Sequence, residues 1–184
     1  MEGSYNKNEA LKTVVLFIVT VSAFLLIRTF LFSPIEVDGA SMYPALEDED
    51  KIVINKLSHY DRFDIIVFKG TNEKIYVKRI IGMPGDKIHF KNDELYINDE
   101  LFDEPYLTTL KQSINSGKLT GSFNLLDLYG ANEIPSGQYF VLGDNRLDSI
   151  DSRNPYIIGL VNEEQILGEV ELIFYPFSNI KWVK

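Results

Sequence analysis

An almost unbroken apolar run at residues 13–32 constrains this chain more than any other feature of its sequence. Apart from threonine, serine and Arg28 the run is apolar, and its length matches the roughly 20 residues that an α-helix needs to cross about 30 Å of hydrocarbon. Arg28 lies near the C-terminal end of the run, where its long side chain can reach the lipid headgroups. Pro34 is expected to end the helix. The run therefore predicts a transmembrane anchor over residues 13–32.

Three other structures compete with a membrane anchor for the same run: a cleaved signal peptide, a buried helix of a soluble protein and an interfacial amphipathic helix. A cleaved signal peptide has a short apolar region followed by a small-x-small cleavage site. Here the run continues into Ser33 and Pro34 without such a site. We therefore expect an anchor that stays attached to the rest of the chain.

The distribution of basic residues around the run predicts its orientation. Lys7 and Lys12 precede it, and after it no basic residue occurs until Lys51. Because cytoplasmic flanks are enriched in Lys and Arg, residues 1–12 are expected in the cytoplasm and residues 33–184 outside it. The chain is thus predicted to be a single-pass protein of the cell membrane whose larger part is extracytoplasmic.

After Pro34 the sequence changes to short alternating apolar runs that Gly, Asn, Asp and Pro interrupt, a pattern typical of strands and turns. The expected strands are 51–55, 65–69, 74–81, 87–91, 94–97, 138–142 and 166–175. No long 3.6-residue repeat follows the anchor, so we predict a mainly β, antiparallel and partly barrel-like domain over residues 33–184. Residues 92–138, irregular above all between 106 and 135, are predicted to form a small insertion or lid.

Composition excludes several classes of function. The formal net charge of -9 argues against nucleic acid as a partner, because neutralising phosphates requires a basic surface. The chain has no cysteine and two histidines, which excludes thiol chemistry and makes a metal site or a cofactor unexpected. Any hydrolytic chemistry must therefore come from Ser, Lys, Asp or Glu.

A candidate nucleophile, Ser41, follows shortly after the predicted anchor. Gly39 and Ala40 before it leave room for another backbone to approach, and Pro44 stiffens the turn behind it. A serine in such a loop is more often structural than catalytic, so this pattern alone leaves both interpretations open.

A candidate base, Lys78, lies in the apolar strand predicted at residues 74–81. Strand alternation places Lys78 and Arg79 on opposite faces, so one of the two must point to the less solvated side. Desolvation disfavours a charged amine and lowers the pKa of a lysine from about 10.4 toward neutrality. A neutral Lys78 could then take the proton of a serine hydroxyl, as in Ser-Lys nucleophilic catalysis. The alternative is a strand lysine whose amine reaches water.

The third segment of interest is residues 143–153, which follow a predicted strand and contain three aspartates, two arginines and two serines. It is either a buried hydrogen-bonded network that supports a site or a solvated charged loop. A calcium loop of the EF-hand type is excluded, because Arg146 stands where such a loop has an oxygen ligand.

Together these segments resemble the type I signal peptidases, bacterial enzymes that release secreted proteins from their leader peptides. The matches follow the order of that family: the anchor, then Ser41-Met42-Tyr43-Pro44, then Lys78-Arg79 followed by Gly82-Met83-Pro84-Gly85-Asp86, then Gly143-Asp144-Asn145-Arg146. The single anchor and short middle region resemble the compact Gram-positive members of the family.

The resemblance implies a role for individual residues. Ser41 corresponds to the acyl-forming nucleophile and Lys78 to the general base, while Ser149 corresponds to the residue that orients the lysine. Asp151 and Arg153 correspond to a supporting ion pair, and Asp144 to a further structural member. No metal or cofactor is implied.

The resemblance also implies the substrate, the signal peptides of exported preproteins, with small residues one and three positions before the cut. Shallow apolar pockets are expected from Ile35, Val37, Met42, Leu46, Tyr76 and Val77. The oxyanion would be held by the Ser41 backbone N–H. Many relatives have a serine as second donor where this chain has Gly39, so that donor is either missing or supplied by backbone or water.

Two alternatives remain. A self-cleaving protein of the LexA type shares the Ser-Lys mechanism, but that family carries a DNA-binding helical domain where this chain has its apolar run. A catalytically silent relative could instead bind exported proteins at the membrane. The presence of both Ser41 and Lys78 favours an active enzyme.

Overall fold

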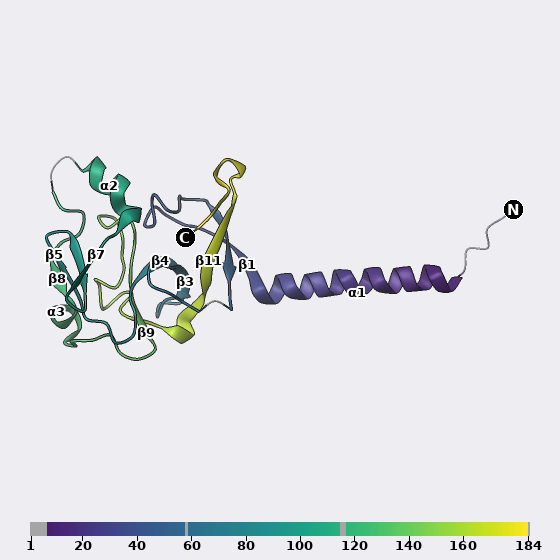
Figure 1. Ribbon diagram of the computed structural model, residues 1–184, viewed down its shortest axis with the longest axis horizontal. Helices are drawn as coiled ribbons and strands as arrows, with labels where there is room; N and C mark the ends of the chain where they lie inside the picture. The colour runs from purple at the N-terminus through teal and green to yellow at the C-terminus, as the bar shows by residue number, and fades with distance from the viewer. Residues whose placement is uncertain (1–6, 58, 115–116, 184) are drawn as a thin grey trace.

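The computed structural model describes residues 7–57, 59–114 and 117–183, and for residues 7–8 and 26–33 it describes the backbone alone. Part of the predicted cytoplasmic segment 1–12 and the side chain of Arg28 therefore lie outside the described residues. Within them the chain forms one long helix and two antiparallel sheets (Figure 1).

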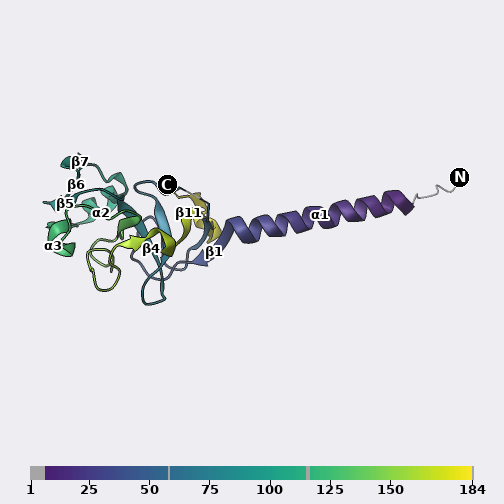
Figure 2. The same ribbon diagram turned by 90° about the horizontal axis from the view of Figure 1, so that it is seen from below.

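The long helix α1, Lys7–Leu31, projects away from the sheets as one continuous element (Figures 1 and 2). It ends one residue before the predicted bound of the anchor, because Phe32 already belongs to strand β1, Phe32–Glu36. Pro34 therefore does not end the helix but lies within this strand. An edge strand tolerates proline, and β1 stands at the edge of its sheet. Across the described part of the chain, no helix has the length and hydropathy that a membrane span requires.

The larger sheet has the strand order β1-β2-β11-β3-β4-β9-β10, and β12 pairs with β11. Its members after β1 are β2 Lys51–Asn55, β3 Ile65–Lys69, β4 Ile75–Gly82, β9 Gln138–Leu142, β10 Val161–Asn162, β11 Ile166–Tyr175 and β12 Lys181–Trp182. All of the pairings are antiparallel, as the sequence predicts for this domain.

The smaller sheet has the order β7-β6-β5-β8 and lies beside the larger one (Figure 1). Its strands are β5 Ile88–Lys91, β6 Glu94–Ile97, β7 Glu100–Phe102 and β8 Phe123–Asn124. The short helices are η1 Pro105–Leu107, α2 Thr108–Ser113, α3 Leu125–Tyr129, η2 Glu163–Gln165 and η3 Phe177–Asn179. The segment 92–138 is thus more regular than predicted, because it supplies three of the four strands of this sheet and two α-helices.

The alternation of side chains along single strands explains how one strand contributes to the hydrophobic core on each of its faces. In β2, Ile52 and Ile54 point inward and are fully buried, whereas the residues between them are partly exposed. In β4, Ile80 packs with Ile66 and Phe68 on one face. On the opposite face Ile81 packs against residues of the smaller sheet. Because β4 is buried on both faces, it can hold charged side chains away from water.

Candidate active site

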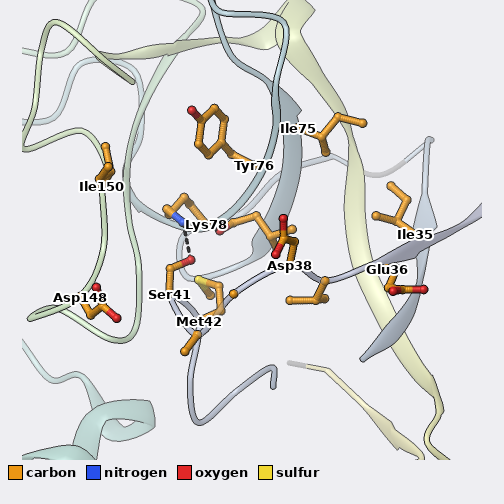
Figure 3. A pocket seen from close by; sticks show the side chains of 14 residues that line it. Ile35, Glu36, Asp38, Ser41, Met42, Ile75, Tyr76, Lys78, Asp148 and Ile150 are labelled. Atoms are coloured by element: carbon orange, nitrogen blue, oxygen red, sulfur yellow. Dashed lines mark hydrogen bonds between the residues drawn. The ribbon is translucent and has the colours of Figure 1, made fainter. Parts of the chain in front are cut away.

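The side chains of Ser41 and Lys78 meet in a cleft of about 550 Å³ between β4 and the segment that follows β1. The Lys78 Nζ lies 2.6 Å from the Ser41 Oγ, and Figure 3 shows the two side chains pointing toward each other. This is hydrogen-bonding distance between an amine and a hydroxyl. The structure therefore brings the sequence-predicted nucleophile and base together.

The position of Lys78 follows from the burial of β4. Its side chain is only 3% exposed, and its other hydrogen bond goes to the carbonyl of Val77 at 3.0 Å. Burial lowers the pKa of Lys78 from 10.5 to about 8, although the carboxylates of Asp151 and Asp144 act in the opposite direction. A substantial fraction of Lys78 is therefore neutral near pH 8.

Arg79, on the opposite face of β4, is buried as well, so both cations are removed from water and not just one of them. The structure compensates its charge: Arg79 donates to both carboxylate oxygens of Asp144, at 2.8 and 2.6 Å, and its guanidinium lies 4.1 Å from the ring centre of Tyr106. Lys78 forms no ion pair with any described residue. Of the two buried cations, Arg79 is thus paired with a carboxylate and Lys78 is not.

Residues 143–153 form the wall of the site behind Ser41 and Lys78, and they make a buried network. Asp151 is fully buried and forms an ion pair with Arg153, with distances of 2.8 Å from both Nε and Nη2. Its Oδ2 also accepts the backbone N–H of Gly143 at 3.1 Å. The structure matches the buried network at Asp144, Arg146, Asp151 and Ser152, whereas Leu147, Asp148 and Ile150 of the same segment are exposed to solvent.

Ser149 is placed beside the site, yet its hydroxyl is buried without a hydrogen-bond partner among the described residues. Its predicted bond to Lys78 is therefore not formed here. A Cβ built on Gly143 would collide with the Ser149 hydroxyl and with the backbone of Ser41. Gly143 thus leaves the space in which Ser149 and the serine loop pack together.

Two backbone N–H groups near Ser41 are candidates for binding the oxyanion, those of Gly39 and of Ser41 itself. Gly39 has a φ of 87° and its N–H already donates to the Asp48 carboxylate at 2.7 Å. That N–H is therefore not a second oxyanion donor. The Ser41 N–H has no acceptor among the residues that the structure describes.

Five of the six residues predicted to bind substrate line the cleft: Ile35, Val37, Met42, Tyr76 and Val77. Leu46 is the exception. It is fully buried in the same hydrophobic cluster as Val37 and Met42, one layer below the cleft surface. Its side chain supports the loop that carries Ser41 and does not reach the space a substrate could occupy.

The cleft also has lining residues that the sequence analysis did not single out. Three carboxylates, of Glu36, Asp38 and Asp148, and the side chains of Ile75 and Ile150 border it (Figure 3). All of them adjoin a residue that was predicted for the site, so a search of flanking positions would have found them. The described residues contain no group of acidic and histidine side chains that could hold a metal ion.

Comparison with known proteins gives consistent matches over nearly the whole chain. The family model described as signal peptidase, peptidase S26, matches residues 9–175. Signal peptidase I of Bacillus caldolyticus is 47% identical over 165 residues, which cover 87% of this chain and 88% of that protein. Signal peptidase I S of Bacillus subtilis is 41% identical, covering 98% of this chain and 97% of that protein.

Among solved structures, the crystal structure of a signal peptidase I from Enterococcus faecalis matches with a TM-score of 0.57 at 36% identity. The match covers 61% of this chain and 97% of that chain. These likenesses confirm the resemblance that the sequence motifs indicated. The chain therefore belongs to the signal peptidase family, peptidase S26.

Proposed function

We propose that this chain is a membrane-anchored serine endopeptidase that removes signal peptides from exported preproteins, with Ser41 as nucleophile and Lys78 as general base. The observation that carries the proposal is the 2.6 Å contact between the Ser41 hydroxyl and a buried Lys78 amine. The name signal peptidase I, which the matched relatives carry, describes cleavage of signal peptides, and we extend that activity to this chain.

The chemistry needs no group beyond the chain and one water molecule. Neutral Lys78 takes the proton of Ser41 as the hydroxyl oxygen attacks the scissile carbonyl, and the Ser41 N–H stabilises the resulting oxyanion. The ammonium then protonates the leaving amine, which departs with the mature protein. Lys78 next deprotonates a water molecule, whose oxygen attacks the acyl carbonyl. The bond from the acyl carbon to the Ser41 Oγ then breaks, the Lys78 ammonium returns the proton to that oxygen, and the signal peptide leaves with a new C-terminal carboxyl group. Ser149 would accept a hydrogen bond from the ammonium during these steps.

The free edge of β4 supports binding of an extended signal peptide beside Ser41. Strand β3 pairs with β4 from Ile75 to Arg79, but β9 on the other side pairs with β4 only from Arg79 onward. The backbone groups around Tyr76 and Val77 therefore have no strand partner on the cleft side among the described strands. A substrate strand can add there by main-chain hydrogen bonds, with its small side chains in the shallow apolar pockets.

Anchoring in the lipid bilayer is supported by the surface of α1. Its described side chains between Val14 and Val19 are 50–68% exposed although all six are apolar. Thr13 and Thr20 donate their hydroxyls to backbone carbonyls one turn earlier, which satisfies them without water. With the basic residues Lys7 and Lys12 in the cytoplasm, α1 would hold the cleft on the outer side of the cell membrane, where signal peptides emerge.

Cleavage of a preprotein by purified, lipid-reconstituted full-length chain tests the proposal. Ser41→Ala and Lys78→Ala should each lower the cleavage rate by at least about a thousandfold, because the nucleophile and the base act together and removing either one disables both. Ser136→Ala and Lys87→Ala, which alter an exposed serine and an exposed lysine, are the matched controls and should cleave normally. Undiminished cleavage by Ser41→Ala would reject the proposal, as would an inactive wild type.

A further inference from the structure

The loop that carries Ser41 is tied to the segment after β9 by two hydrogen bonds from one residue, Asn145. Its side-chain Nδ2 donates to the carbonyl oxygen of Ala40 at 3.2 Å. Its backbone N–H donates to the carbonyl oxygen of Ser41 at 3.1 Å. These two bonds grip the peptide units immediately before and immediately after the nucleophile, although Asn145 is 105 positions away from Ala40 in the sequence.

Planarity of the peptide bond gives the first of these contacts a consequence for the chemistry. The Ala40 carbonyl and the Ser41 N–H belong to one rigid trans unit, in which C=O and N–H point in opposite directions. The Ala40 carbonyl accepts two hydrogen bonds, from the Asn145 side chain at 3.2 Å and from the Tyr43 backbone N–H at 3.1 Å. Holding the carbonyl on these two donors directs the Ser41 N–H away from Asn145. A hydrogen bond to the carbonyl also polarises the unit and makes the N–H a stronger donor.

Asn145 is itself held firmly, because it stands between two fully buried charged residues. Asp144 before it is paired with Arg79 on β4. Arg146 after it donates its Nε to the Gly143 carbonyl at 3.1 Å and binds Glu104 of the neighbouring segment. The backbone of Asn145 also accepts the N–H of Asp148 at 3.0 Å. Because the backbone of Asn145 is held in place in this way, its side chain can keep the serine loop in a fixed position.

We infer that Asn145 is a positioning residue that, together with the Tyr43 N–H, sets the direction and strength of the oxyanion donor, the Ser41 N–H, through its hydrogen bond to the Ala40 carbonyl. The inference rests on the proposed function, because an oxyanion forms only if Ser41 attacks a carbonyl. Asn145 does not contact the reacting atoms in this arrangement. It acts on the transition state, in which the oxyanion exists, and leaves binding of the uncleaved peptide unchanged.

Two substitutions isolate the side-chain bond, since both keep the backbone bond to Ser41. Asn145→Ala removes the amide, and Asn145→Asp keeps its shape but replaces the donor by an acceptor that repels the Ala40 carbonyl. We expect kcat at the alkaline plateau to fall by at least about tenfold in both, with KM within twofold of wild type. In Asn145→Ala the midpoint of the pH profile should not move, because Lys78 is untouched.

Two inhibitors provide a readout that a merely structural role would not produce. A peptide aldehyde with alanine at the last and third-last positions adds to the Ser41 hydroxyl and places its oxygen where the oxyanion forms. The matched peptide alcohol cannot add to the hydroxyl. Affinity for the aldehyde should fall in parallel with kcat in both variants, while affinity for the alcohol stays within twofold.

The matched control is Asn124→Ala in the smaller sheet. The Asn124 side chain makes two hydrogen bonds, both to Asp127 and both 2.7 Å long, but it does not line the cleft. This variant should retain kcat and both affinities. Wild-type kcat in Asn145→Asp, or an equal loss of affinity for aldehyde and alcohol, would overturn the inference while Ser41→Ala remained inactive. Activity in Ser41→Ala would instead reject the proposed function.

Discussion

At the scale of single residues, the decisive feature is a lysine that is buried without a counter-charge. Because Lys78 must be neutral to accept a proton, and its pKa is about 8, its active fraction rises from roughly a tenth at pH 7 to roughly nine-tenths at pH 9. The cleavage rate should therefore increase about tenfold over this range and then level off. Initial rates on a peptide substrate measure this, and a rate that is flat from pH 6 to pH 10 would contradict the assignment.

The same burial should make Lys78 lower the free energy of unfolding. A fall of the pKa from 10.5 to about 8 corresponds to about 3 kcal/mol at about 1.4 kcal/mol per unit. This cost is fully present below pH 8, where the unfolded state is protonated and the folded state must protonate a buried amine, and it disappears as the pH rises to 10.5. Lys78→Met also loses two hydrogen bonds of about 0.5–1.5 kcal/mol each. It should therefore stabilise the protein by up to about 2 kcal/mol at pH 7 while abolishing cleavage.

Denaturant unfolding at two pH values tests this trade-off. The advantage of Lys78→Met over wild type should shrink between pH 7 and pH 10.5. Lys87→Met, which changes an exposed lysine, should behave like wild type at both. A Lys78→Met variant that is less stable than wild type at pH 7 would mean that the amine is better solvated than its burial implies.

At the scale of elements, the ion pair between Glu104 and Arg146 links the two sheets. Glu104 follows β7 of the smaller sheet, and Arg146 follows β9 of the larger one, with both side chains at most 1% exposed. Glu104 also accepts the Tyr106 hydroxyl at 2.8 Å, and Arg146 donates to the Thr120 hydroxyl at 2.9 Å. The pair thereby attaches the segment 92–138 to the loop that positions Ser41.

Removing one partner of this ion pair should lower the free energy of unfolding by much more than the intact pair contributes to it. Glu104→Ala leaves the Arg146 charge buried and unpaired, and we expect a loss of about 3–5 kcal/mol in the free energy of unfolding. Glu133→Ala, which breaks an exposed pair with Lys87, should cost less than about 1 kcal/mol. Urea titrations of both variants measure the difference. Equal effects would show that the buried pair is not a structural link.

At the scale of the whole molecule, α1 should decide where the enzyme works. In the proposed arrangement the full chain floats with phosphatidylcholine vesicles even in high salt, because attachment is hydrophobic and the net charge of -9 offers no attraction to anionic lipid. Replacing Leu16 and Phe17 together by Asp should move the protein into the aqueous fraction, since each charge costs about 3 kcal/mol at the centre of a span.

The matched control replaces Leu16 and Phe17 by Ala, which keeps the helix apolar and should preserve flotation. Cleavage of a short soluble peptide should survive in the Asp variant, whereas cleavage of a vesicle-bound preprotein should fall. A full-length wild type that stays in the aqueous fraction would refute the anchor.

Much of the secondary structure can be predicted from the sequence alone, because a strand with one buried face repeats its pattern every two residues within a few positions. The predicted bounds of β2, β3, β6, β9 and β11 are those of the structure. The short strands β7, β8, β10 and β12 have too few residues to show a period. Strand β1 was missed because its proline resembles a helix terminator, and only its place at the sheet edge makes the proline harmless.

The chemistry of the site divides in the same way. The sequence by itself determined which side chains were available, a serine in an accessible loop and a lysine within an apolar strand, since residue type and local pattern are properties of the chain. Only the tertiary structure decided that Ser41 and Lys78, 37 positions apart, share a hydrogen bond and that Arg79 is neutralised by Asp144. It also decided that Leu46 lies beneath the cleft and that Asn145 holds the serine loop. These outcomes depend on which distant segments exclude water from one another, and such long-range packing has no local signature.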